Sequence, residues 1–529
     1  MSINLCYQVR RDMRFIKPKR PYTWLILLLM IALSGCHTAP PNVRLLTDSS
    51  GAYGQRFLKV IQHYQRSGEQ TKLQAAYVIL ANLKGQTHTT GPGVVGYQSL
   101  FHQLLTVPEA HKKDYETIWD SLTNAAPDIH LSDVAEREDF KTITPDYLIA
   151  HIDAAFRAWQ MPWAKSLSFN DFCAYILPYK LVDELPSSWM QTVQKRYHWL
   201  ADSMKGSTDA YKACLLLNND LKNNFTIRSF PSMWDSGFPE LDAIRSGKCY
   251  QATEYTTFVM RAMGIPVVMD GTPTWGNASG GHDWNALIDH GKPVPFVGSE
   301  SDPGLTKIEL AFQRKRPKVF RHTFDLQPQA LASLQEREDL EEPIPLEFHN
   351  QRLKDVTKEY LPVTDIAVNL KKNGLDRKIA YLCVYSRQDW VPVYWARIAD
   401  QNRATFSDMG RDILYLPAYN GDQGRMVGAG NPVYADTSGK VQTLNPNPAK
   451  QIDITVSKKG PDGPNIEKGK TYELCYWQEH WVFAGKETAS GKTVCFKHVP
   501  SNAVYWVSNP DKATKERIFT YTNHTLSWH

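Results

Sequence analysis

The stretch that decides the central fold reads GKCYQATEYTTFVMRAMGIPVVMDGT over residues 247–272 and HDWNALIDHGKPVPFV over 282–297. Apolar residues recur at helical spacing from Ala252 to Met263, and the following Gly-Ile-Pro ends that helix, because Gly suits its left-handed end and Pro cannot continue it. The pattern then predicts a strand at 266–269 and a hairpin over 282–297. We therefore expect the order helix, strand, hairpin.

Cys249 lies in the first turn of the predicted helix. Unpaired backbone N–H groups, the positive end of the helix dipole and the neighbouring Lys248 favour a thiolate there, so we expect a thiol pKa below the usual value of about 8.5. On its own, a cysteine at a helix start is more often a small buried hydrophobe. His282, which opens the hairpin, supplies the base that such a thiol needs, and strand alternation turns Asp283 to the other face.

Three motifs together resemble the transglutaminase-like superfamily of papain-like cysteine enzymes: Gly247-x-Cys249, the helix end at 261–267, and His282-x-Trp284-Asn285. The resemblance covers roughly residues 225–305, about one sixth of the chain. It implies an α+β papain-like core in which Cys249 attacks an amide carbonyl to form a thioester and His282 moves the proton. It also makes Trp284 the packing aromatic of the site.

The third catalytic residue departs from the family pattern. These families place an aspartate near the end of the hairpin, where it orients the histidine, and here that position holds Val297. Antiparallel pairing puts Ser299 opposite His282, so a one-residue bulge would bring Glu300 beside the imidazole. We expect Glu300 to be the third residue, with Asp302 or no carboxylate as the alternatives; without one, the site would be weakened or inactive.

Residues 1–36 have the composition of a targeting segment. A basic stretch precedes an apolar run over 24–33, which ends in a Leu-Ser-Gly-Cys sequence that resembles the bacterial lipobox. This predicts a lipoprotein signal peptide, with Met13 as an alternative start and Cys36 as the lipidated first residue of a membrane-anchored protein in the bacterial cell envelope. An ordinary secretory signal or a short membrane anchor is the alternative.

Charge and cysteine content narrow the function classes. The chain of 529 residues carries a formal charge of +5, but the basic excess lies in residues 1–36, and the remainder is formally neutral. Bulk charge therefore gives no reason to expect a nucleic-acid partner. Removal of Cys6 and lipidation of Cys36 leave six cysteines whose irregular spacing fits neither a disulfide scaffold nor a zinc site, so we predict no metal and no cofactor.

The chain divides into five parts by pattern. Helical apolar spacing dominates 45–225, where Ser168 precedes a helix as its N-cap, and short β-rich runs dominate from about 346. Residues 381–385 and 472–476 resemble each other at an offset of 92, which suits two tandem β-sandwiches. The expected domains are 1–36 signal peptide, 37–225 helical region, 226–345 transglutaminase-like catalytic domain, 346–440 β-sandwich and 441–529 β-sandwich.

Two functions follow from these features. The first is a cysteine enzyme that acts on peptide or isopeptide amides of a peptide or protein substrate, with hydrolysis favoured over amine transfer because water is abundant in the envelope. Glycan is a second expected ligand, through the C-terminal domains. The alternative is a catalytically weakened or inactive envelope protein whose β-sandwich domains bind glycan or peptide.

Overall fold

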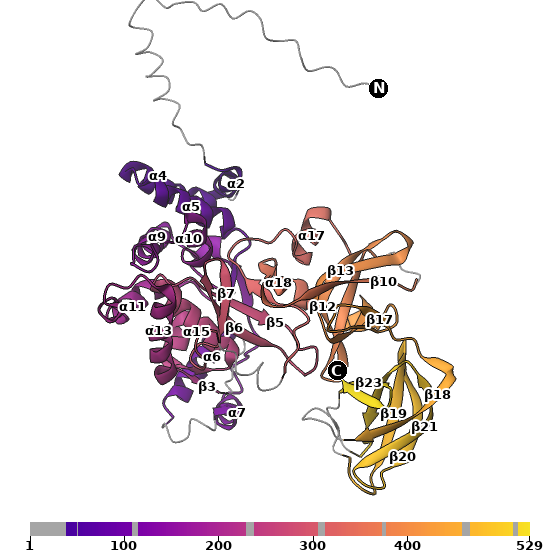
Figure 1. Ribbon diagram of the computed structural model, residues 1–529. Helices are drawn as coiled ribbons and strands as arrows, with labels where there is room; N and C mark the ends of the chain where they lie inside the picture. Colours follow the sequence, from indigo (N-terminus) through magenta and orange to yellow (C-terminus); the bar gives the residue numbers. More distant parts are fainter. Residues whose placement is uncertain are drawn as a thin grey trace, which may run out of the picture.

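The computed structural model describes residues 39–49, 51–107, 115–228, 237–304, 313–372, 377–457, 466–511 and 517–529. The predicted signal segment and Cys36 lie outside these ranges. A helical part, a mixed central part and two β-rich parts follow one another along the chain (Figure 1). Among the residues described, no helix combines the length and apolar character that crossing a membrane requires.

The first part is helical, as predicted. Its α-helices are α2 (Pro41–Ser49), α3 (Gly51–Gln55), α4 (Leu58–Ser67), α5 (Gln70–Leu83), α6 (Pro92–Leu105), α7 (Tyr115–Ala125), α8 (Asp139–Thr142), α9 (Pro145–Trp159), α10 (Phe169–Tyr175), α11 (Trp189–Arg196), α12 (Leu200–Met204) and α13 (Ala210–Asn224). A short antiparallel pair, β1 (Thr87–Thr90) and β2 (Ala135–Glu138), lies among them. The Ser168 hydroxyl accepts a hydrogen bond from the Asp171 backbone N–H at 3.1 Å, which confirms the predicted N-cap of α10.

The central part has the predicted order of helix, strand and hairpin. It contains α14 (Gly237–Ile244), α15 (Cys249–Ala262), β5 (Val267–Thr272), β6 (His282–Asp289), β7 (Lys292–Phe296), β8 (Phe320–His322) and β9 (Leu353–Asp355). The five strands form one sheet in the order β7-β6-β5-β8-β9, and a short parallel pair, β3 (Thr226–Ile227) and β4 (Ser246–Gly247), precedes α15. Gly264 ends α15 with φ of 70°, in agreement with the predicted Gly-Ile-Pro stop.

Helix α15 packs against the sheet through β5 and β6. The Asn285 side-chain amide donates to the Thr253 carbonyl oxygen and to the Thr257 hydroxyl, both at 2.9 Å, and Leu287 joins the same core as the helix. Trp284 packs on the opposite face of the sheet. Because side chains alternate along a strand, His282 starts β6 on the Trp284 face.

The first β-rich part is antiparallel and forms one continuous sheet. Its strands are β10 (Val363–Asn369), β11 (Ile379–Ser386), β12 (Asp389–Ala399), β13 (Arg403–Gly410), β14 (Ile413–Asn420), β15 (Met426–Gly428), β16 (Val433–Ala435) and β17 (Val441–Thr443). The order is β10-β13-β12-β11-β14-β16-β17, with β15 beside β14. Strand β12 pairs with β11 along most of its length and with β13 at its end. In a β-sandwich these strands would belong to two separate sheets, and here β12 connects them into one.

The second β-rich part has two antiparallel sheets. Its strands are β18 (Asn447–Ser457), β19 (Thr471–Gln478), β20 (His480–Thr488), β21 (Thr493–Ser501), β22 (Val504–Ser508), β23 (Ile518–Thr522) and β24 (Thr525–Trp528). One sheet is β18-β21 and the other is β20-β19-β22-β23-β24.

The two β-rich parts repeat each other in detail. Strands β11 and β19 each pair with the next strand and with β14 or β22, and each has a register shift just before its cysteine, Cys383 or Cys475. The Tyr415 hydroxyl donates to a carbonyl oxygen five residues earlier at 2.8 Å, and the Tyr505 hydroxyl does the same at 2.6 Å. The predicted repeat is therefore present, and the six described cysteines are all free thiols.

Contacts tie the loop between β5 and β6 to the β-rich parts. The Gly280 backbone N–H donates to the Ser386 hydroxyl at 3.2 Å. Arg517, which is 3% exposed, donates to the carbonyl oxygens of Gly276 at 3.4 Å, of His529 at 2.7 Å and of Tyr385. One guanidinium therefore bonds to the central loop, to β11 and to the second β-rich part.

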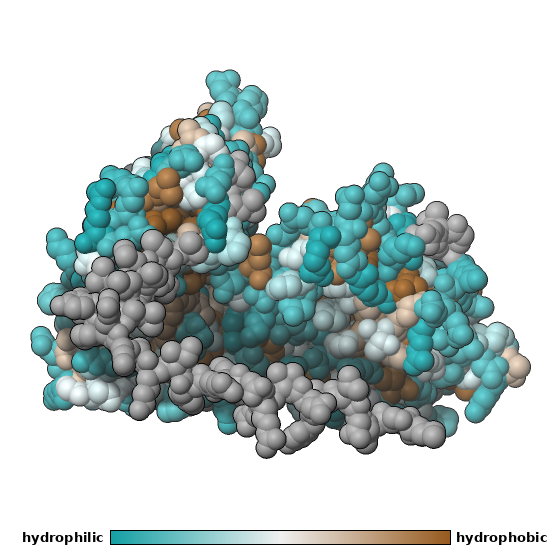
Figure 2. All heavy atoms as spheres, turned by 90° about the horizontal axis from the view of Figure 1, so that it is seen from above, coloured by the Kyte–Doolittle hydropathy of each residue, from teal (hydrophilic) through white to brown (hydrophobic). Residues whose placement is uncertain are grey.

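The face seen from above is largely hydrophilic, and its hydrophobic residues form small separate patches (Figure 2). The most exposed large hydrophobic side chains among the described residues include Val95, Leu346 and Phe483, which lie on different elements.

Candidate active site

Cys249 is the first residue of α15, and close packing in the turn before it fixes where the helix starts. A Cβ atom at Gly247 would lie 2.5 Å from the Cβ atom of Gln251, a separation that leaves room only for glycine. The Lys248 backbone N–H donates to the Gln251 side-chain oxygen at 3.1 Å and so satisfies one N–H that the helix cannot. The Gly-x-Cys motif thus has a steric cause, and it places the thiol at the helix N-terminus.

The groups around the Cys249 thiol have opposing effects on its pKa. Burial raises the pKa of the thiol, and the Asp283 carboxylate raises it further, whereas hydrogen bonds from the backbone N–H groups of Asp283, Tyr250 and Cys249 lower it. The net pKa lies above the ordinary value, contrary to the sequence-based expectation of a depressed one. The main reason is burial of the thiol, to which the Asp283 carboxylate adds, while the exposed Lys248 is not among the groups that act on the sulfur.

The imidazole of His282 is held between two tryptophans. It is 6% exposed, its ring stacks on Trp275 with centroids 5.9 Å apart, and the ring of Trp284 lies 6.1 Å away. Burial lowers the pKa of His282 to about 4, so the imidazole is neutral at neutral pH. A neutral imidazole is the form that can accept a proton.

Cys249 contacts the edge of β6 that β7 leaves unpaired, at the residue that follows His282. Strand β7 pairs with β6 only from Asn285 onward, so the edge beside His282 and Asp283 has no strand partner. The Cys249 sulfur takes that place, because it accepts the Asp283 backbone N–H. The described contacts contain no hydrogen bond between the sulfur and the imidazole, so the structure brings the two residues to the same edge without a direct bond.

The third position of the expected triad is apolar. Val297 is 1% exposed and packs against Trp284, so it lies on the His282 face where the family aspartate would stand. The chain then turns: the Glu300 backbone N–H donates to the Val297 carbonyl oxygen at 3.0 Å, and Asp302 forms an ion pair with Lys222 of α13. Within the described ranges no carboxylate, Glu300 included, forms an ion pair with His282, and burial alone shifts its pKa.

A buried polar network that sequence reasoning missed supports Trp284 from behind. The Arg321 guanidinium makes two hydrogen bonds of 2.8 Å to the Asp270 carboxylate, which also accepts the Tyr360 hydroxyl. Tyr360 in turn accepts the Trp284 indole N–H at 3.3 Å. An aspartate inside an otherwise apolar strand was the available signal, because a buried carboxylate requires partners.

In the part of the chain that the structure describes, no group of three or more His, Cys, Asp and Glu side chains could hold a metal ion.

Comparison with known proteins finds similar chains among solved structures. No family model and no curated protein matches the sequence. Among solved structures, the chain is similar to a candidate cysteine protease from Cytophaga hutchinsonii, at 17% sequence identity and a TM-score of 0.19. The similarity covers 22% of this chain and 41% of that protein.

Proposed function

We propose that the protein is a transglutaminase-like cysteine enzyme that cleaves peptide or isopeptide amides through a thioester on Cys249. One observation carries the proposal: three backbone N–H groups, from the first turn of α15 and from Asp283, converge on the Cys249 sulfur beside the buried, neutral His282. This arrangement suits an anion that forms during reaction. It combines a nucleophile, a base and hydrogen-bond donors in one place.

The proposed reaction starts from a neutral thiol and a neutral imidazole. His282 accepts the thiol proton as the sulfur attacks the carbonyl carbon, and backbone N–H groups near the sulfur stabilise the negative charge on the carbonyl oxygen. The C–N bond then breaks, the leaving amine takes the proton from His282, and a thioester remains. Water, deprotonated by His282, attacks the thioester, which releases the carboxylic acid and restores the thiol.

The location of this activity is part of the proposal. Anchoring through Cys36 would hold the enzyme in the cell envelope, where its substrates would be peptides or proteins. Hydrolysis is favoured over amine transfer because water is abundant in the envelope, whereas an amine acceptor would have to be bound specifically.

The test uses the purified protein with casein and dansylcadaverine. New peptide termini report hydrolysis, and protein-bound dansyl groups report amine transfer. The Cys249→Ala variant should lose both products, whereas Cys495→Ala, which removes an exposed free thiol on β21, should retain them. Full activity in Cys249→Ala would rule out the proposal.

A second candidate function rests on Val297 and Asp283. An apolar residue in place of the orienting acid and a carboxylate beside the thiol both oppose formation of the thiolate–imidazolium pair. An inactive protein that binds peptide or glycan would have this arrangement. Absence of product from the folded wild-type protein, together with an unreactive Cys249, would favour it.

A further inference from the structure

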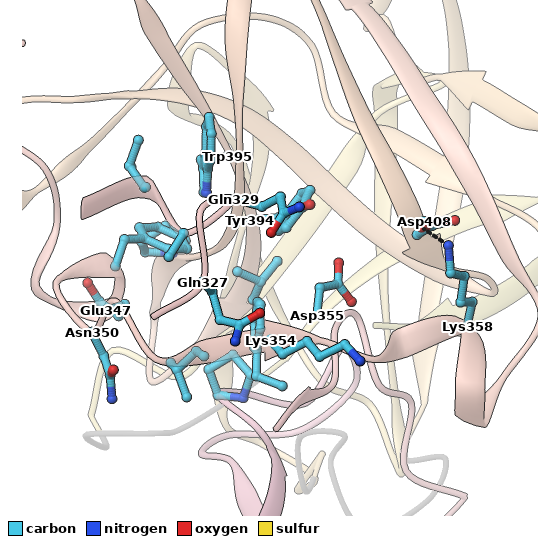
Figure 3. Close-up of a pocket in the computed structure, with 18 residues that line it drawn as sticks. Gln327, Gln329, Glu347, Asn350, Lys354, Asp355, Lys358, Tyr394, Trp395 and Asp408 are labelled. Carbon is cyan, nitrogen blue, oxygen red and sulfur yellow. Dashed lines mark ion pairs between the residues drawn. The ribbon is translucent and has the colours of Figure 1, made fainter. Parts of the chain in front are cut away.

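We propose that a cavity between the central part and the first β-rich part binds a short neutral oligosaccharide. The cavity has a volume of about 490 Å³, within the range of about 300–1,000 Å³ that small-ligand sites occupy. Strand β9 and the start of α17 (Leu331–Glu338) form one wall, and residues of β12 form the other (Figure 3). A ligand there would contact both parts of the chain.

Aromatic side chains line the cavity on more than one side. Tyr394 and Trp395 are consecutive residues of β12 that point to opposite faces of the strand, and Phe348 and Phe320 also line the cavity. Flat aromatic rings stack against the C–H faces of sugar rings, which are apolar although the ring edges carry hydroxyl groups. Aromatic side chains in the lining therefore fit a cyclic ligand whose edges are polar.

The Tyr394 side chain is held in place by contacts with other residues of the protein, without a ligand. The ammonium of Lys318, which is fully buried, lies 3.6 Å from the Tyr394 ring centroid and bonds to the Asp355 carboxylate at 2.5 Å. The same carboxylate accepts the Tyr394 hydroxyl and, at 2.6 Å, the Thr357 hydroxyl. Such preorganisation reduces the entropy lost on binding.

Two amide side chains offer complementary hydrogen-bonding groups. The Gln327 amide nitrogen already donates to the Thr323 hydroxyl at 3.0 Å and to the Asp325 carbonyl oxygen at 3.1 Å, which leaves its oxygen as an acceptor. The Asn350 oxygen accepts the Arg352 backbone N–H at 2.8 Å, which leaves its nitrogen as a donor. A hydroxyl group both donates and accepts, so it can use both.

The two lysines that line the cavity each lie near an acidic side chain, and Glu347 adds a further acidic group to the lining. Lys358 lies 3.6 Å from Asp408, the pair drawn with a dashed line in Figure 3, and Lys354 lies 4.0 Å from Glu359. Asp355 is paired with Lys318, as described above. With Glu347, Asp355 and Asp408 beside the two lysines, the lining has no excess of positive charge, so a neutral polar ligand is favoured over a phosphate group.

The test is calorimetric titration of the purified full chain with cellotriose, maltotriose and triacetylchitotriose. Saturable binding of at least one is expected. Trp395→Ala should weaken that binding at least tenfold and Asn350→Ala several-fold, whereas Phe483→Ala, which removes an exposed aromatic on β20, should not change it. Thermal unfolding of each variant shows whether it is folded. If Trp395→Ala does not fold, Gln329→Ala, at an exposed lining residue, takes its place.

Three results would overturn the inference: no binding of any trisaccharide to the folded wild type, binding that these variants leave unchanged, or Trp395-dependent binding of casein peptides or pyrophosphate instead. None of them depends on turnover at Cys249. Failure here and failure of the proposed enzyme activity are therefore separate outcomes.

Discussion

Asp283 changes how the Cys249 site works at the scale of single residues. Its backbone N–H favours a thiolate, while its own carboxylate and burial disfavour one, and the second pair of effects is larger. The site thus rests as a neutral thiol and forms its charge only when a substrate is attacked. Strand alternation predicted that Asp283 faces away from His282, but it did not show that the thiol lies beside it.

Replacing Asp283 with asparagine should lower the pKa of Cys249. The Asp283 carboxylate raises the thiol pKa in addition to burial, so Asp283→Asn should speed alkylation of Cys249 by iodoacetamide near pH 8 severalfold. Mass spectrometry of the Cys249 peptide measures this rate across pH. Asp289→Asn at the far end of β6 is the control and should leave the rate unchanged. An unchanged pKa in Asp283→Asn would show that burial alone sets it.

The pH dependence of the proposed activity should follow His282. Its pKa is about 4 in the folded protein, below the ordinary 6.5, so the imidazole stays able to accept a proton until the pH falls through about 4. The acid limb of kcat/KM should therefore lie near pH 4. Trp275→Ala opens the ring to water and should move that limb toward 6.5. A wild-type limb at 6.5 would contradict the burial of His282.

At the scale of elements, sequence patterns predicted α15 and the hairpin because each is bounded by Gly or Pro. Those residues act locally, through φ angles and missing N–H groups, so a single sequence reveals them. The end of β7 at Phe296 was not predictable in the same way. It depends on hydrogen bonds from the turn to distant residues, including the Ser299 backbone N–H to the Asn218 side chain at 3.0 Å. The expected bulge that would carry Glu300 to His282 is replaced by this turn.

A glycine can be required by a positive φ angle alone, as at Gly280, or also by a close approach of another backbone, as at Gly264. The φ angle is 70° at Gly264 and 78° at Gly280, so both residues are in the left-handed region. A Cβ atom added at Gly264 would lie 2.3 Å from the Ala158 carbonyl oxygen, whereas a Cβ atom added at Gly280 would have no atom within 4 Å. Gly280→Ala should cost about 1–2 kcal/mol from backbone strain, and Gly264→Ala about 1–3 kcal/mol more from the clash. Urea unfolding gives both values, and equal losses would mean that the helix end can shift.

At the scale of the whole molecule, buried histidines should make stability depend on pH. Burial lowers the pKa of His151 to about 4, so below pH 6.5 the unfolded chain binds a proton that the folded chain does not. His282 and His529 behave alike, with pKa values of about 4 and about 3. Stability is therefore complete above pH 6.5 and is lost toward pH 4, by about 3 kcal/mol for His151 alone.

Urea unfolding between pH 4 and 7 measures this loss. His151→Gln should flatten the dependence, while His290→Gln, whose side chain is 94% exposed, should leave it unchanged. Equal slopes in the wild type and His151→Gln would mean that His151 is protonated in the folded protein.

Arg517 should hold the central and β-rich parts together. Its removal leaves buried carbonyl oxygens without a donor, each at a cost of about 1–3 kcal/mol. We expect Arg517→Ala to speed proteinase K cleavage in the loop at 273–281, as measured by the rate of fragment formation. Arg425→Ala removes an arginine that follows a surface turn and serves as control. Unchanged cleavage in Arg517→Ala would show that other contacts suffice.

The same guanidinium has a consequence for the order of synthesis. The loop that carries Trp275 onto His282 is bonded by a residue that the ribosome adds more than two hundred positions later. A nascent chain can form α15 and the hairpin early, yet the imidazole gains its finished surroundings only once residue 517 has emerged and folded back. A chain that stops short of that point would carry the cysteine and the histidine but would lack this clamp on the wall that keeps the histidine neutral.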